Sequence, residues 1–323
     1  MRINFICCIA VLFPCFFFGQ RNSGFTRDIG IVTDNDIFVG WKKTDEFFSF
    51  GVGVTYNFKS DRFIGAHKFF KKSSAHFYTL AIKQEAFTPS NRNISGEILE
   101  KRLFRFDRPF AGILFSRVGI TNTYTRSILK TNVHIGVMGE QSGAEKIQDW
   151  FHSKILNEST LEGWDFQLAN QFLFNIDTAF IYDFTPQLKW FNFYGIAKGQ
   201  LGNLYIDASS EIAFRLGWFR KLHFSVAEGN QILAPKDKKI ELFYKLSFLG
   251  RINAFNATAQ GTIFGEDSIH KIEKLSVFDQ HISHNIFVSW KHFYLSGAYF
   301  FTFERVVPNE RHIYGSIKTG IRF

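Results

Sequence analysis

Apolar and polar residues alternate along most of this chain, in stretches of about ten residues. In residues 313–323 the odd positions carry mainly isoleucine, and the even positions carry Tyr, Ser, Lys, Gly and Arg. Residues 295–303 alternate in the same way, after a tight turn at Lys291 and His292. Because successive side chains of a strand point to opposite faces, these segments predict strands with one apolar and one polar face, at a length typical of membrane barrels.

Similar segments recur throughout the chain, and together they predict about a dozen strands. They lie at residues 30–39, 51–58, 77–86, 114–125, 131–138, 168–184, 188–197, 210–218, 242–255, 257–264 and 286–290. Many outward positions carry Phe, Leu or Ile, and a soluble protein rarely exposes so many. Only helices and closed barrels satisfy their backbone polar groups in lipid. The pattern therefore favours an all-β fold, a transmembrane antiparallel β-barrel, over a soluble sandwich.

The composition agrees with membrane-spanning strands. Aromatic residues make up 18% of the 323 residues, with 42 Phe, yet the mean hydropathy is only −0.06. Alternation dilutes apolar residues in this way, whereas membrane-spanning helices do not. Beyond the first residues, no run approaches the roughly 18 apolar residues of such a helix. No shift in composition marks a second domain, so we expect residues 20–323 to form one barrel domain.

Residues 1–19 have the features of a secretory signal peptide. Arg2 supplies the positive charge, an apolar run follows it, and Gly19 lies in the zone where cleavage would occur. A membrane anchor is the alternative interpretation. All three cysteines lie in this segment, so the mature chain would contain no disulfide, thiol nucleophile or thiolate metal ligand.

The formal net charge of +9 favours partners that carry negative charge. A basic surface suits nucleic acid and anionic lipid equally well. For an exported chain we expect contact with outer-membrane lipids and no nucleic-acid partner, and a merely basic soluble surface is the alternative.

One short segment, residues 143–152, has the periodicity of an amphipathic helix rather than of a strand. At helical spacing Glu145, Gln148 and His152 lie along one side, next to an apolar stripe that includes Ile147. A polar row that ends in a histidine, on the clearest helix of a β protein, is a candidate for catalytic chemistry. A structural lid is the alternative.

Oxygen-bearing side chains gather near the first two predicted strands. Asp34, Asn35 and Asp36 end the first strand and offer ligands for a hard cation such as Ca²⁺, although the same residue types also start turns. Ser49 opens the second strand and offers a hydroxyl, or it faces the lumen. The Asp-Arg-Pro sequence around Arg108 is more typical of a turn than of a catalytic site.

Several other chemistries have no support in the sequence. It contains no G-x-S-x-G, H-E-x-x-H, P-loop or glycine-rich dinucleotide motif. Its ten histidines show no spacing typical of metal ligands. The closest pair is His281 and His284, which we expect to face water or the lumen.

These features, in this order, resemble the LpxR-type family of lipid A 3′-O-deacylases, which are outer-membrane barrels. The resemblance runs through nearly the whole mature chain. It rests on Asn35-Asp36, Phe48-Ser49-Phe50-Gly51, the Asp-Arg-Pro-Phe-Ala-Gly sequence of residues 107–112, residues 136–139 leading into Glu145, Gln148 and His152, residues 163–167, and Gly250-Arg251 with Asn256.

The resemblance implies a barrel of about twelve strands whose active site lies between the barrel wall and a helix of an extracellular loop. It also implies Ca²⁺-dependent hydrolysis of an acyl ester of lipid A, the anchor of lipopolysaccharide, in the outer leaflet. By that resemblance the catalytic residues are His152, Gln148 and Asn35, and the metal ligands are Asp36, Ser49 and Glu158.

The chain departs from the family pattern at some positions. Ser49 stands where members often have Thr, which keeps the hydroxyl. Glu158 is placed by spacing alone, and Glu162 is the alternative ligand. A basic residue that the family places after the third strand has no exact counterpart. Candidates for this phosphate-binding role are Arg92, Lys101 and Arg102.

The mechanism expected from these residues is attack of water on an ester carbonyl, with His152 as general base and Gln148 orienting the ring or the water. Two other classes of function are the alternatives. One is an outer-membrane esterase of phospholipase type, and the other is a non-enzymatic barrel that serves as a pore or a surface binder. A closed barrel has no free edge, so a monomer is expected.

Overall fold

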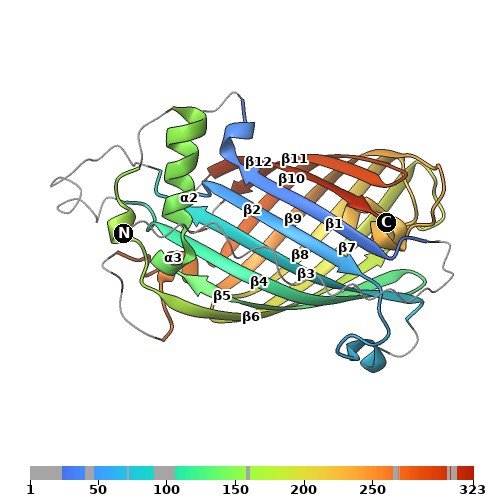
Figure 1. The fold of residues 1–323 in the computed structure, drawn as a ribbon, viewed down its shortest axis with the longest axis horizontal. Helices are drawn as coiled ribbons and strands as arrows, with labels where there is room; N and C mark the ends of the chain where they lie inside the picture. The colour runs from blue at the N-terminus through green and yellow to red at the C-terminus, as the bar shows by residue number, and fades with distance from the viewer. Residues whose placement is uncertain are drawn as a thin grey trace, which may run out of the picture.

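The computed structural model describes residues 24–40, 47–70, 73–90, 106–157, 161–264, 268, 270–303, 306 and 311–323, which form a closed antiparallel barrel (Figure 1). The strands of these residues are β1 Arg27–Asn35, β2 Phe50–Phe58, β3 Ala75–Phe87, β4 Ala111–Thr123, β5 Ser127–Met138, β6 Gln171–Asp183, β7 Phe191–Gly202, β8 Tyr205–Trp218, β9 Glu241–Asn256, β10 Phe278–Trp290, β11 Phe293–Phe303 and β12 Arg311–Arg322. Each strand pairs with its sequence neighbours, and β12 pairs with β1. The predicted fold class is confirmed.

The outer face of the barrel is an apolar belt. In β6 the side chains of Phe172, Phe174 and Phe180 are exposed, while Asn175 and Asp177 between them are buried in the lumen. Exposed apolar side chains lie on each of the other strands as well, namely Ile31, Val54, Ile82, Val118, Ile135, Leu201, Ile212, Phe248, Ile286, Leu295 and Ile317. An apolar belt around a polar interior is the arrangement that a bilayer requires of a barrel.

The helical elements are short. They are α2 Ala144–Phe151 with its π-helical continuation His152–Leu156, α3 Ala257–Gln260, and 3₁₀ turns at Asp36–Phe38, Ala66–Phe69, Glu140–Ser142, Trp164–Phe166, Leu222–Phe224, Val226–Glu228 and Gln231–Leu233. Among the described residues, no helix combines the length and the apolar character needed to cross a bilayer. The helix predicted at residues 143–152 is confirmed, and its continuation through a π turn ends at Asn157, whose φ is +55°.

One expected strand is wrong and another ends earlier than predicted, in both cases where an asparagine caps a helical turn. Residues 257–264 do not form a strand, because the Asn256 side chain accepts a hydrogen bond from Thr258 N at 3.0 Å and starts α3. The first strand stops at Asn35 instead of residue 39, because the Asn35 side chain accepts a hydrogen bond from Ile37 N at 2.8 Å. In both cases a local side-chain hydrogen bond ends the strand.

The connection between β8 and β9, residues 219–240, fills the lumen at one end of the barrel. On one side Gln231 donates to the Asp28 carboxylate of β1, at 3.2 Å to each oxygen. On the other side Tyr194 of β7 donates to Glu228 at 2.7 Å. β1 and β7 lie six strands apart in the closed order, so this connection crosses the lumen. The C-terminus lies at the same end, opposite α2 (Figure 1).

Candidate functional site

The candidate residues of the first strands meet at one rim of the barrel because of the strand register. Asn35 of β1 lies opposite Phe50 of β2, Phe50 opposite Ala86 of β3, and Ala86 opposite Gly112 of β4. Neighbouring strands are about 4.8 Å apart, so these four positions span about 15 Å of the rim. Figure 1 shows α2 lying against this same rim.

Asn35 and Asp36 form the end of β1. The Asn35 amide oxygen holds the following 3₁₀ turn through its bond to Ile37 N. Asp36 begins that turn, and only 5% of its surface is exposed. A carboxylate that is buried needs a partner or a bound cation to offset its lost hydration. The amide therefore fixes the backbone from which a buried carboxylate projects.

Asp34 has a different environment from Asp36. Its carboxylate lies 2.9 Å from Lys83 Nζ and accepts a hydrogen bond from Ser316 Oγ at 2.6 Å. Lys83 also lies 2.7 Å from the Glu85 carboxylate. Asp34 is thus neutralised by a luminal lysine, which leaves Asp36 as the acidic candidate at the end of β1. This pairing could not be predicted from the sequence, because Lys83 lies on β3, far from Asp34 in the chain.

Ser49 lies directly before β2 and is completely buried. Its Oγ lies 2.6 Å from Thr88 Oγ1, and its N–H donates to Ala86 O at 3.0 Å. Thr88 follows β3, so the contact joins two neighbouring strand ends. The site thereby gains a second hydroxyl that the sequence analysis did not single out.

The start of α2 rests directly on the barrel wall. Gln84 Nε2 donates to Ser142 O at 2.5 Å. A β-carbon at Gly112 would come within 2.5 Å of the Ala144 Cβ and would also overlap Ser142 Oγ. Glycine at position 112 is therefore required for the helix to approach β4 this closely.

Gln148 is held in one orientation by Trp164. The indole N–H of Trp164 donates to Gln148 Oε1 at 2.8 Å, and both side chains are buried. The Trp164 ring packs on Phe110, with ring centroids 5.3 Å apart. An indole N–H can only donate, so the Gln148 amide atom that faces it must be the oxygen. This bond fixes the orientation of the amide group. Trp164 is a positioning residue that the sequence analysis missed.

His152 follows the last residue of α2 and is also buried, with 6% of its surface exposed. Its backbone N–H donates to the carbonyl oxygens of Gln148 and Asp149. Burial raises the pKa of the Asp149 carboxyl, and the charge of His152 works against that rise.

Acidic side chains gather around the half-buried Glu145 of α2. Burial raises the pKa of the Glu145 carboxyl, and the negative charges of Asp149, Asp165 and Glu140 add to the rise. These mutually repelling carboxylates create a negative field beside the helix, which favours cations.

Arg108 has the structural role that its turn-like sequence predicts. It is buried and donates to Phe47 O at 2.9 Å and to Thr258 O at 3.0 Å. Its guanidinium also lies 4.6 Å from the centre of the Phe87 ring. Arg108 therefore ties together three loops at the rim.

Some expected site residues lie outside the described residues. They are Glu158, Arg92, Lys101 and Arg102, together with the predicted signal peptide at residues 1–19. The alternative ligand Glu162 is described, and it is exposed two residues before Trp164.

The fold and the candidate site together define a class of protein. A closed barrel with an apolar belt, a lumen that is closed at one end and a helix packed on the wall at the other end is an outer-membrane β-barrel, and its candidate site lies at the rim.

The family of the chain follows from its sequence. Residues 5–323 match the family described as "Outer membrane protein LpxR", so the chain belongs to the LpxR family. Membership implies a lipid A 3′-O-deacylase, an ester hydrolase of the outer membrane. No curated protein sequence matches the chain.

A solved structure shares the fold. LpxR from Salmonella typhimurium matches with a TM-score of 0.73 and 16% identity, over 92% of this chain and 100% of that one. The β domain of the Bordetella autotransporter BrkA matches with a TM-score of 0.44 and 8% identity, over 93% of this chain and 100% of that one.

Replacing Gly112 by alanine should displace the start of α2 while the barrel stays closed. We expect hydrogen exchange to speed up in α2, and lipid A deacylation to fall by up to about 100-fold because catalytic groups would move by an ångström or so. Gly199→Ala is the matched control, since a β-carbon there meets no atom within 4 Å. Equal exchange rates in the two variants would contradict the close packing at Gly112.

Proposed function

We propose that this chain removes a 3′-O-linked acyloxyacyl chain from lipid A by hydrolysing its ester, with His152 as the general base. The observation that carries the proposal is the burial of Gln148 and His152 along one helical segment, which contacts β3 and β4 at the same rim as Asp36 and Ser49. A membrane barrel does not need buried polar groups at its surface in order to fold. Family membership indicates the reaction that these groups would carry out.

His152 has the chemistry that the base requires. A neutral imidazole takes a proton from water near physiological pH, and Asp149 lies close enough to interact with the resulting positive charge. The proton would later pass to the departing sugar oxygen. Burial keeps bulk water away from this transfer and strengthens the electrostatic interaction.

Gln148 donates a hydrogen bond rather than accepting one in this proposal. Its oxygen accepts from Trp164, so Nε2 is the atom of this amide that would donate in the reaction. A fixed amide donor stabilises the negative oxygen that develops when water adds to an ester carbonyl. Asn35 acts differently, because its oxygen holds the turn that presents Asp36.

The oxygen atoms at the rim fit Ca²⁺. Asp36 supplies a buried carboxylate and Ser49 a buried hydroxyl, and Ca²⁺ prefers such hard oxygen ligands. Glu158 would complete the set, with Glu162 as the alternative. When bound, the ion would polarise the ester carbonyl as a Lewis acid.

The location of the site suits a substrate in the outer leaflet. Long connections at the α2 end include residues 88–110, 139–170 and 257–277, and outer-membrane barrels carry their longer loops outside the cell. The site then opens beside the apolar belt, where acyl chains stay in the bilayer. Arg92, Lys101 and Arg102 would attract the lipid A phosphates. The chain would work as a monomer, because a closed barrel presents no free edge.

The two alternatives differ in what they predict for the cell's lipids. A phospholipase-type esterase would release lysophospholipid and leave lipid A intact, and a surface binder would change neither lipid. An open pore agrees poorly with residues 219–240, which cross the lumen. Mass spectrometry of lipid A and phospholipids from cells with and without the protein separates these outcomes.

Replacing His152 by alanine should abolish deacylation and leave the barrel folded. We expect the rate to fall by about 10²- to 10⁴-fold, the usual contribution of a general base. Mass spectrometry of lipid A incubated with the purified variant measures the loss. His223→Gln, in the connection between β8 and β9 at the other end, is the control. Undiminished activity in His152→Ala would refute the proposed base.

Replacing Trp164 by phenylalanine should lower the turnover number without changing the Michaelis constant. The variant keeps the aromatic packing on Phe110 but loses the hydrogen bond that fixes Gln148. A hydrogen bond of about 0.5–1.5 kcal/mol corresponds to a roughly 2- to 10-fold lower kcat. Steady-state kinetics on lipid A in mixed micelles measures both constants. A higher KM with the same kcat would instead place Trp164 in substrate binding.

Chelating Ca²⁺ should stop deacylation, and Asp36→Asn should raise the Ca²⁺ concentration needed for half-maximal activity by about ten-fold or more, because a ligand charge is lost. Glu273→Gln removes an exposed carboxylate in the connection between β9 and β10 and serves as the control. The measurement is a Ca²⁺ titration of the deacylation rate. Full activity in excess chelator would remove the metal from the mechanism.

A further inference from the structure

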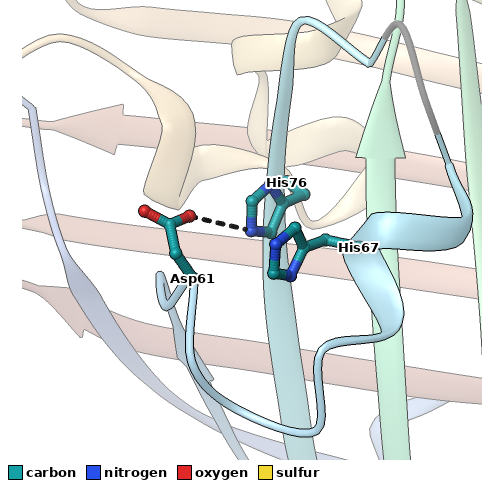
Figure 2. A group of neighbouring side chains, drawn as sticks. All are labelled: Asp61, His67 and His76. Carbon is teal, nitrogen blue, oxygen red and sulfur yellow. Dashed lines mark ion pairs between the residues drawn. The ribbon is translucent and has the colours of Figure 1, made fainter.

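Two histidines and an aspartate come together at the end of the barrel opposite α2. Figure 2 shows Asp61, His67 and His76 facing one another in the connection between β2 and β3 and at the start of β3. One potential ligand atom from each residue lies within 4.8 Å of those of the other two. The sequence analysis found no metal-ligand spacing among the histidines, because nine positions separate His67 from His76 and folding alone joins them.

The distances suit a small tetrahedral metal ion. His76 Nε2 lies 3.4 Å from Asp61 Oδ1, and the two imidazole rings are parallel within 5° with centroids 4.6 Å apart. Ligand atoms bonded to Zn²⁺ at 2.0–2.2 Å in tetrahedral geometry lie about 3.4 Å from one another. The Asp61–His76 pair already has this separation, and His67 needs to move by only about an ångström.

Both imidazole rings are held in place by neighbouring groups. His67 Nδ1 lies 3.2 Å from the hydroxyl of Tyr78, a fully buried residue of β3. This contact leaves Nε2 of His67 as its ligand atom. His76 Nε2 lies 3.1 Å from Ser60 O and 3.4 Å from Asp61 Oδ1, so a metal ion bound by this nitrogen would replace its hydrogen bond to Ser60. His67 has the usual arrangement of a metal-binding histidine, in which the other ring nitrogen is held by a hydrogen bond.

The type of ligand and the exposure indicate which ion fits. Two imidazoles and one carboxylate suit zinc and similar transition-metal ions, whereas Ca²⁺ and Mg²⁺ prefer sites made of oxygen alone. The Asp61 side chain is 65% exposed and the His76 side chain 17%, so one side of the cluster stays open for a water ligand.

We propose that Asp61, His67 and His76 bind a divalent transition-metal ion of the Zn²⁺ type. The ion would fasten the connection between β2 and β3 to the start of β3. Its position, at the opposite end of the barrel from α2, separates it from the proposed Ca²⁺ site in place and in chemistry. The role is structural, since the cluster touches none of the residues proposed for ester hydrolysis.

The test is a Zn²⁺ titration of the untagged full-length protein in detergent micelles with Ca²⁺ present, read by competition with a chromophoric chelator. We expect binding of Zn²⁺ that weakens by roughly ten-fold or more in His67→Gln/His76→Gln and in Asp61→Asn. His223→Gln is the matched control, because this histidine lies at the same end of the barrel but outside the cluster. Its Zn²⁺ affinity should equal that of the wild type.

Two further measurements keep the proposal falsifiable. Co²⁺ bound to the wild type should show the intense visible bands of a tetrahedral site, and these should disappear in the double variant. Far-ultraviolet circular dichroism confirms that the barrel is folded, and Asp61→Asn changes an exposed side chain that the barrel does not need. Equal Zn²⁺ affinity in the wild type, the double variant and Asp61→Asn would overturn the proposal, whatever the deacylase activity.

Discussion

The pairing of β1 with β12 is the interaction on which the rest of the structure depends. It runs from Asp28 opposite Arg322 to Asn35 opposite Gly315. Within lipid, each backbone group left without a partner costs several kcal/mol, so an open sheet would not persist there. Closure holds β1 between β12 and β2 and so fixes the order of the strand ends. The candidate site exists because that order places Asn35, Asp36 and Ser49 at one rim.

The two ends of the barrel serve different purposes. At the α2 end, close packing at Gly112 and the bond from Trp164 to Gln148 fix polar side chains that the barrel does not need for stability. At the other end, residues 219–240 close the lumen through contacts with β1 and β7. Because the lumen is closed at this end, a continuous channel through the barrel is blocked, and the candidate site lies at the opposite rim.

Much of the fold could be predicted because strand alternation is a local property. A lipid-facing strand must be apolar at every second residue, so the sequence marks nearly every strand directly. The errors fall where a single side chain ends a strand, as Asn256 does before α3 and Asn35 does before its 3₁₀ turn. Of the expected site, Gln148 and His152 were found by helical periodicity, whereas the family resemblance supplied Asn35 as a catalytic residue.

The sequence by itself determined the barrel, its apolar belt, the helix that bears His152 and the family resemblance, since each depends on residues close together in the chain. Only the tertiary structure decided that Lys83 neutralises Asp34, that Trp164 orients Gln148, and that Asp61, His67 and His76 converge. These contacts join separate segments, and their geometry follows from barrel closure and strand register. No local pattern in the chain encodes such long-range geometry, so sequence periodicity does not reveal it.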